Sequence, residues 1–262
     1  MKLSLNYRIQ EPEKIYGGRF SLTKDIMNHL FDNAKIDRKF NNFLKDKSVI
    51  IVGPTPYTKN KKRADYIESF DVIVRLNKQW NISEDMQEFI GKRTDIRYHC
   101  GMEQSNNGGP WDIEEMKKYG VKWAAINFPE YLDYFHDDVQ KFKTLNKDYN
   151  LNFHCFSDLE LYCTIHHHLG TRMNVGTAAA LDLMFYDIKS LHIMGMTFFQ
   201  GGHVEGYKEK RNVDFLKTVW DEENLALGPN HAQKPQQELI KMLHEMDNRL
   251  TLDDEVKEVI YK

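Results

Sequence analysis

The chain has 262 residues and a net charge of −3, with 41% hydrophobic and 29% charged residues. This composition supports a folded core and excludes a largely disordered chain. A protein whose main role is to bind nucleic acid usually carries a strong positive excess, so the charge argues against that role. The length suits a single α/β domain with or without a small lid.

The N-terminal residues and the cysteines indicate the compartment. The sequence holds no run of about 18 apolar residues and no apolar core of a signal peptide. Its three cysteines, Cys100, Cys155 and Cys163, form no Cys-x-x-Cys motif, and their odd number favours free thiols in a reducing compartment. We therefore expect a soluble, cytoplasmic protein without a membrane span, and a viral or bacterial source fits that expectation.

Residues 1–47 are polar and contain two helical patterns. Apolar side chains recur at helical spacing at Leu22, Ile26, Leu30 and Phe31, and again at Ile36, Phe40, Phe43 and Leu44. These patterns predict two helices that pack on the main domain.

Strand and helix patterns then alternate. The run Ser48–Val52 is apolar throughout, which indicates a strand buried on both faces, as in a parallel sheet. Further strands are expected at 71–76, 94–98, 121–126, 151–155 and 190–195, with helices at about 84–90, 111–119, 130–143, 158–168 and 175–186. This alternation predicts an α/β fold with a doubly wound parallel sheet.

The C-terminal part begins with a segment that breaks the alternation. Residues 197–230 are rich in charge, glycine and aromatic residues, and they predict a lid over the carboxyl edge of the sheet. An amphipathic helix is expected at about 233–248.

The turn after the first strand is the first candidate site. It reads Gly53-Pro54-Thr55-Pro56, and a glycine at the end of a buried strand lets the backbone approach a ligand closely. It lacks the Gly-x-Gly-x-x-Gly pattern, so dinucleotide binding is poorly supported. A nucleotide site and an ordinary βα turn are equally good interpretations of the spacing.

The end of the second strand is the next candidate. Asn77 carries a donor and an acceptor, which suit a base edge, a ribose or a phosphate oxygen. Arg75 is able to pair with a ligand carboxylate, but an internal ion pair is the favoured interpretation.

A third candidate is the start of the helix predicted at 175–186. Asn174 suits the N-cap, and the unpaired N–H groups of a helix start form a ready phosphate site. Gly176 and Ala178–Ala180 also fit a tightly packed core helix, whereas Asn174 to Thr177 suit either role.

Polar residues after the last predicted strand are suited to acid–base chemistry. His203 and Tyr207 follow that strand closely, and both are able to donate to a leaving phosphate. His231 precedes a helix and follows a loop with Gly and Pro, and an imidazole suits a general base for a sugar hydroxyl.

Metal binding is not expected. His166-His167-His168 are consecutive, so their side chains fan around a helix and cannot share one ion. The chain has no Asp-x-Asp, and the adjacent pairs Asp137-Asp138 and Asp253-Asp254 are expected on polar surfaces. The sequence therefore predicts a mechanism without a metal or another cofactor.

Taken in order, these segments resemble the motifs of sialyltransferases, over residues 48 to about 245. Each motif alone is a weak signal, whereas four in the same order are fairly specific. Val49–Asn77 is similar to the large motif and Gly91-Lys-Arg-Thr-Asp95 to its end; Asn174–Gly195 resembles the small motif, His203 with Tyr207 the short His/Tyr motif, and His231 the last one.

The sequence also departs from the family pattern. Pro54 stands where the bacterial enzymes have the Asn of Gly-Asn-Gly, and Gln236 stands where the family has an acid, five residues after His231. Asn174 or Thr177 takes the place of the Ser or Thr of the small motif. The cysteines of the two motifs are absent, and with them the disulfide that links them in the eukaryotic enzymes.

The resemblance implies a single glycosyltransferase domain over 1–262, with a Rossmann-like doubly wound sheet of the GT-A-like sialyltransferase variant and a small helical lid. It implies inverting transfer of sialic acid, or of a related keto-sugar such as Kdo, from a CMP-sugar to a glycan or glycolipid acceptor. His231 would be the base, and His203 and Tyr207 would hold the phosphate. The donor nucleotide would contact Gly53, Thr55, Asn77, Asn174, Val175, Gly176 and Thr177.

Two other classes of function are weighed against this one. A noncatalytic nucleotide- or glycan-binding protein on the same fold is favoured by Pro54 and Gln236 and opposed by His231. A pyrophosphokinase-like enzyme would need ATP, Mg²⁺ and carboxylates near the phosphates, and the sequence shows no such carboxylates.

Overall fold

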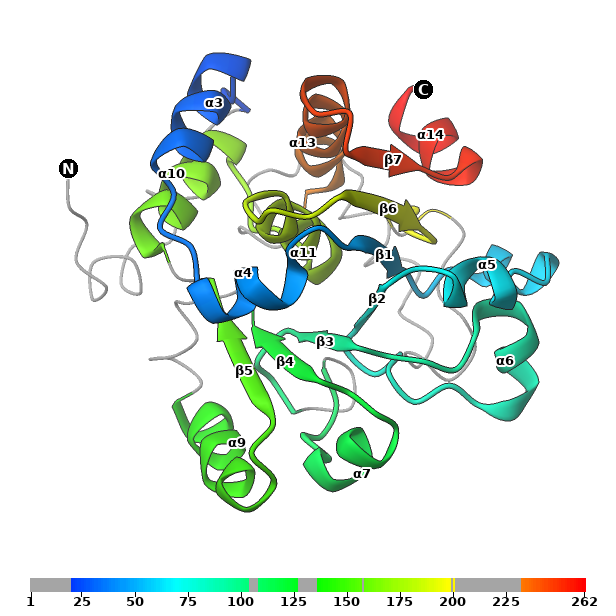
Figure 1. Cartoon of the computed structure of the whole chain (residues 1–262). Helices are drawn as coiled ribbons and strands as arrows, with labels where there is room; N and C mark the ends of the chain where they lie inside the picture. Colours follow the sequence, from blue (N-terminus) through cyan, green and yellow to red (C-terminus); the bar gives the residue numbers. More distant parts are fainter. Residues whose placement is uncertain (1–19, 104–107, 127–135, 157, 199, 201–231) are drawn as a thin grey trace.

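The sheet is parallel throughout the part of the chain that the computed structural model describes, which is residues 20–103, 108–126, 136–156, 158–198, 200 and 232–262. Its strand order is β5-β4-β3-β2-β1-β6-β7 (Figure 1). The strands are β1 Ser48–Val52, β2 Val72–Leu76, β3 Ile96–His99, β4 Trp123–Ile126, β5 Asn152–Cys155, β6 Ser190–Met194 and β7 Leu250–Leu252. The predicted doubly wound parallel sheet is confirmed.

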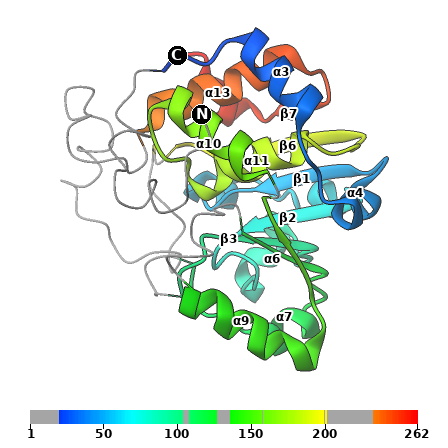
Figure 2. The same ribbon diagram turned by 90° about the vertical axis from the view of Figure 1, so that its left-hand side faces the viewer.

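Helices cover both faces of this sheet. Figure 1 shows α3, α4, α10, α11 and α13 on one side of the strands and α5, α6, α7 and α9 on the other, and Figure 2 shows the same layers from the side. Their bounds are α3 Lys24–Asn33, α4 Arg38–Leu44, η1 Pro56–Asn60, α5 Ala64–Glu68, α6 Glu84–Ile90, α7 Ile113–Lys118, α9 His136–Tyr149, α10 Leu159–Leu169, α11 Val175–Met184, α13 Gln233–Met246 and α14 Asp254–Ile260.

The apolar strands produce this layering because successive side chains point to opposite faces. In β1, Val49 and Ile51 join the core beneath α11 and α13, whereas Ile50 and Val52 join the core beneath α5 and α6. Both faces are therefore buried, as the continuous apolar run predicts. No helix of the described residues is long and apolar enough to cross a membrane.

The predicted helices before the first strand are confirmed as α3 and α4, but the sequence pattern did not reveal β7 and α14. β7 has only three residues, Leu250-Thr251-Leu252, which is too short to form a recognisable run. It pairs with β6 through Leu191, His192 and Ile193. Asp253 then caps α14 by accepting from the Val256 N–H at 2.8 Å.

A buried charged cluster joins α4 to the sheet. His154 on β5 contacts Asp182 of α11 at 2.9 Å through Nε2 and Asp37, the N-cap of α4, at 3.3 Å through Nδ1. The Tyr98 hydroxyl donates to the same Asp182 oxygen at 2.8 Å. Burial alone lowers the pKa of His154, but the two carboxylates outweigh it and raise the pKa to about 9. His154 is therefore charged at neutral pH.

This cluster makes stability depend on pH. The pKa of His154 is raised in the folded state, so its stabilisation is complete below the unfolded value of about 6.5 and is lost as the pH rises through about 9. We expect the free energy of unfolding to fall by roughly 3 kcal/mol between pH 6 and pH 10 from this group.

Urea unfolding at a series of pH values measures this loss, and His154→Asn is the control for other groups that titrate in this range. The wild type and the variant should converge as the pH rises. Two curves that run parallel across the whole range would show that His154 is not charged in the folded protein.

Candidate functional site

β2 to β5 lie on one side of β1 and β6 lies on the other, so the order of strands in the sheet reverses between β1 and β6. Gly53 follows β1 and Gly195 follows β6, both at the carboxyl ends of their strands. Ligands of open α/β sheets bind at such a reversal. A Cβ built on Gly53 would lie 2.0 Å from the Gly195 carbonyl oxygen, and one built on Gly195 would lie 2.7 Å from the Gly53 oxygen. Gly195 also has a φ of +76°, a left-handed conformation that favours glycine. No side chain fits at either position, so the backbone itself forms this part of the edge.

Asn77 follows β2 at the same edge and is held in place on several sides. Its φ is +52°, which asparagine tolerates better than most residues. Its N–H donates to the Tyr98 carbonyl at 2.7 Å, and its Oδ1 accepts from the Cys100 N–H at 3.0 Å. Nε of the buried Arg97 donates to its carbonyl at 2.8 Å. Asn77 therefore joins β2 to β3, and its amide has a fixed orientation.

Two buried side chains near Gly53, those of Gln79 and Thr55, each have one oxygen atom without a hydrogen-bond partner among the described residues. Gln79 donates through Nε2 to the Gly53 carbonyl at 3.2 Å, and its Oε1 has no partner. The Thr55 hydroxyl has none either, although its carbonyl accepts from the Thr58 hydroxyl at 2.7 Å. Buried polar groups are normally paired, so such atoms are suited to a ligand. The sequence pattern did not reveal Gln79.

The start of α11 lies at this edge. A Cβ on Gly176 would meet the Met196 Sδ at 2.9 Å and the Leu76 Cδ1 at 3.2 Å, and these residues stand at the ends of β6 and β2. Asn174 caps the helix, as predicted, and its side chain accepts from the Thr177 N–H at 2.9 Å. Thr177 is fully buried, and its hydroxyl has no partner in the described part of the chain.

The start of α13 is bound directly to the start of α11. Gln236 is fully buried and accepts from the Asn174 N–H at 2.7 Å through Oε1. Its Nε2 donates to the Ala232 carbonyl at 2.9 Å. The Ala232 N–H in turn donates to the Thr171 hydroxyl at 2.9 Å. The residue that follows His231 in the chain is thereby held beside the segment that leads into α11.

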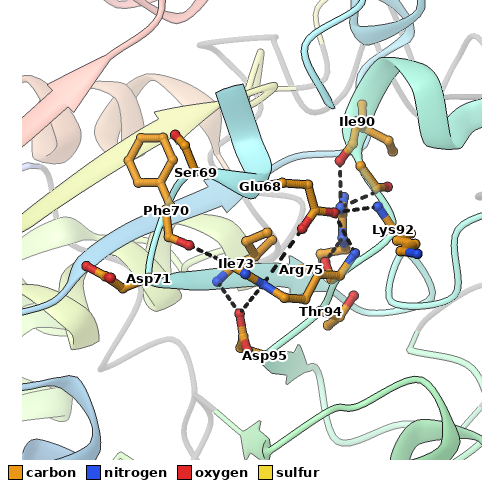
Figure 3. Close-up of polar contacts among 12 residues, drawn as sticks. Glu68, Ser69, Phe70, Asp71, Ile73, Arg75, Ile90, Lys92, Thr94 and Asp95 are labelled. Carbon is orange, nitrogen blue, oxygen red and sulfur yellow. Dashed lines mark hydrogen bonds and ion pairs between the residues drawn. The ribbon is translucent and has the colours of Figure 1, made fainter. Parts of the chain in front are cut away.

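The internal ion pair favoured for Arg75 is not formed among the described residues, and its hydrogen bonds are to backbone carbonyls instead. It donates to Ile90 at 2.6 Å, Gly91 at 3.3 Å and Arg93 at 3.1 Å, at the end of α6 (Figure 3). Burial lowers the pKa of Arg75 to about 10. The guanidinium remains charged at neutral pH, and it faces the negative end of a helix dipole.

The segment Gly91–Asp95, which resembles the end of the large motif, lies at the opposite edge of the sheet, because it precedes β3. Glu68 accepts from the Lys92 N–H at 2.7 Å and from the Arg93 N–H at 2.9 Å (Figure 3). Asp95 accepts from the Ile73 N–H at 2.8 Å. These contacts anchor the turn to α5 and β2, so its role in this structure is to connect elements.

Asp253 corrects one expectation about the acidic pairs. Its side chain is only 9% exposed, and it accepts from the Gly195 N–H at 3.3 Å and contacts Arg63 at 3.6 Å. The expected polar surface is therefore wrong for Asp253, which supports the glycine turn after β6. The sequence pattern does not predict the burial of Asp253, because this residue follows β7 and its partner Gly195 follows β6, far away in the chain.

The three consecutive histidines diverge, as expected. His166 is buried 4.1 Å from the Tyr162 ring, His167 is exposed, and His168 contacts the Ser21 hydroxyl at 2.9 Å. Within the ranges described above, no group of three or more His, Cys, Asp or Glu side chains is placed to hold a metal ion.

The predicted catalytic residues His203, Tyr207 and His231 lie outside the described residues, as does almost all of the predicted lid at 197–230. Their roles therefore remain predictions. The predicted donor-binding residues are all described. Contacts connect Gly53 to Gly195 and Gly176 to Leu76 and Met196, so these residues share one edge of the sheet.

The chain thus has a parallel α/β sheet with polar groups and a helix start at the reversal of strand order, the edge at which open α/β sheets bind their ligands. No protein-family model and no curated protein matches the sequence. Solved structures of sialyltransferases, however, share the fold.

A mammalian sialyltransferase has 12% sequence identity and a TM-score of 0.53, over 96% of this chain and 86% of that one. The monofunctional alpha-2,3-sialyltransferase Cst-I from Campylobacter jejuni has 15% identity and a TM-score of 0.52, over 85% and 80%. The sialyltransferase CstII from the same organism, solved with the substrate analogue cytidine-5'-monophosphate, has 14% identity and a TM-score of 0.50, over 79% and 80%. The chain therefore has the fold of sialyltransferases, which are glycosyltransferases.

Proposed function

We propose that the protein transfers sialic acid, or a related acidic keto-sugar such as Kdo, from a CMP-sugar to a glycan or glycolipid acceptor. The observation that carries the proposal is the edge at the strand reversal. There the Gly53 turn, the buried unpartnered groups of Thr55 and Gln79, and the start of α11 come together. The fold supports it, since sialyltransferases share the architecture.

In this proposal the donor nucleotide lies across the carboxyl ends of β1, β2 and β6. Gly53 and Thr55 contact it from the first turn, Asn77 from the end of β2, and Asn174, Val175, Gly176 and Thr177 from the start of α11. The N–H groups and dipole of that helix start stabilise the phosphate, with help from His203 and Tyr207. These groups bind the charge that develops as CMP leaves.

His231 acts as the general base in the same proposal. It removes the proton from the acceptor hydroxyl, whose oxygen forms a bond to the anomeric carbon of the sugar while the bond from that carbon to the phosphate oxygen breaks. The attack inverts the anomeric centre, and CMP leaves with both electrons of the broken bond. Ala232, the first described residue of this segment, donates its N–H to the Thr171 hydroxyl at 2.9 Å.

Metal removal tests the mechanism directly. The sequence has no Asp-x-Asp to hold a metal–nucleotide, so we expect CMP binding in the micromolar to millimolar range with EDTA present. Titration calorimetry with CMP, before and after EDTA treatment and with added Mg²⁺ or Mn²⁺, measures this. Binding or turnover that requires the added metal would contradict the proposed mechanism.

Calorimetry with ATP and NAD in parallel separates the other functions. Binding of ATP with Mg²⁺ would favour the pyrophosphokinase-like alternative. Binding of CMP without any turnover of a CMP-sugar would favour a noncatalytic binding protein on this fold. Comparison of CMP-sialic acid and CMP-Kdo as donors identifies the sugar.

A further inference from the structure

We propose that Gln236 is a positioning residue that holds the starts of α11 and α13 together and keeps the start of α11 free of negative charge. This inference rests on the proposed function, because it concerns the helix start assigned to the donor phosphate. It assigns a role to a residue that differs from the acid of the sialyltransferase pattern.

The side chain of Gln236 forms one hydrogen bond to the start of α11 and one to the start of α13, and these two hydrogen bonds form a bracket between the helices. The Gln236 amide accepts from the Asn174 N–H at 2.7 Å and donates to the Ala232 carbonyl at 2.9 Å, and the side chain is fully buried. Asn174 is the N-cap of α11, and its side chain in turn accepts from the Thr177 N–H. Ala232 is fixed a second time by the Thr171 hydroxyl. A shift of either helix start therefore breaks hydrogen bonds that belong to the other.

The neutral amide of Gln236 completes the bracket at neutral pH, whereas an ionised carboxylate at the same place does not. The Asn174 N–H requires an acceptor and the Ala232 carbonyl requires a donor, and a neutral amide supplies both. An ionised glutamate accepts only, so its second oxygen would face the Ala232 carbonyl oxygen. It would also place an unpaired charge where the glutamine is fully buried.

The surrounding charges point in the same direction. α11 and α13 carry no acidic residue in their first turns, whereas α6, α7 and α14 each carry two. An acid near a helix start offsets the partial positive charge that attracts an anion. The neutral Gln236 thus leaves the start of α11, with the unpartnered Thr177 hydroxyl, suited to a phosphate.

The test compares CMP with cytidine, which has the same base and ribose but no phosphate. Titration calorimetry on the full chain gives both dissociation constants for the wild type, Gln236→Glu and Gln236→Met. For Gln236→Glu we expect CMP binding to weaken by about tenfold or more and cytidine binding by less than about threefold. Gln236→Met removes both hydrogen bonds without adding charge, and it should weaken CMP binding by a smaller factor with cytidine little changed.

Gln87→Glu is the matched control. Gln87 lies on α6, and its amide also donates to a backbone carbonyl, that of Ile82 at 3.2 Å. This variant adds the same charge away from the site and should bind both ligands as the wild type does. Thermal unfolding of each variant checks that it is folded. If Gln236→Glu does not fold, the CMP and cytidine dissociation constants of Gln236→Met test the inference.

Three outcomes would overturn the inference. Equal weakening of CMP and cytidine by Gln236→Glu would show a general structural role. Wild-type CMP binding by Gln236→Met would show that the bracket does not position the phosphate site. A wild-type protein that binds neither CMP nor cytidine would refute the proposed function and this inference with it, whereas the first two outcomes leave the proposed function intact.

Discussion

Replacement of His231 by alanine should lower the rate of sugar transfer by about a hundredfold or more, because general-base catalysis typically contributes at least that factor. The affinity for CMP should change little, since the proposed role of His231 is to act on the acceptor hydroxyl and not on the nucleotide. Single-turnover kinetics with a CMP-sugar and a glycan acceptor measure the rate, and calorimetry measures CMP binding. A loss of rate with an unchanged dissociation constant is the expected signature.

His203→Ala is the comparison for this prediction. A group that holds the phosphate acts in both the ground state and the transition state, so this variant should weaken donor binding as well as lower the rate. If His231→Ala kept near-full activity while His203→Ala abolished it with donor binding intact, the two roles would be reversed. If neither substitution mattered, the site would be misplaced.

Replacement of Gly53 by alanine should destabilise the protein by about 3 kcal/mol or more and weaken CMP binding with it. The added Cβ would lie 2.0 Å from the Gly195 oxygen and 2.5 Å from its carbonyl carbon. Both atoms belong to the backbone, so the turns after β1 and β6 have to separate. Urea unfolding and calorimetry measure the two effects.

Gly120→Ala is the matched control, because it isolates backbone strain from steric overlap. Gly120 has a φ of +82°, and no atom lies within 4 Å of its added Cβ. That variant should cost only about 1–2 kcal/mol, the usual penalty of a left-handed conformation, with CMP binding unchanged. A Gly53→Ala variant as stable as the wild type would show that the two turns do not meet as described.

The fold could be predicted because it is carried by local patterns. Val49–Val52 is apolar throughout, and it belongs to an inner strand whose two faces are both covered. Helix starts such as Asn174 are marked by a capping residue that the structure places in that role. β7 was not predicted, because a strand of three residues is too short to show a periodic pattern.

The site could be predicted only in part, because its geometry depends on contacts between distant segments. The position of Gly53 directly after a buried strand made it a candidate. Its contact with Gly195 could not be predicted, because Gly195 follows a strand far along the chain. Nothing in the local sequence indicates that Gln79 bonds to Gly53 or that Gln236 bonds to Asn174. Such pairs become visible only when the sheet brings the ends of its strands together.

The bond between His154 and Asp37 bears on where this domain can be shortened. Asp37 caps α4, and the Phe40 ring on that helix stacks 4.1 Å from the imidazole. A protein engineered to start at β1 would lack Asp37, one of the two carboxylates that contact His154, and would also lack Phe40, so the imidazole ring of the charged His154 would be exposed. Such a protein should therefore be less stable than the full chain, because α4 contributes both a charge partner and a stacked ring to the core of the sheet.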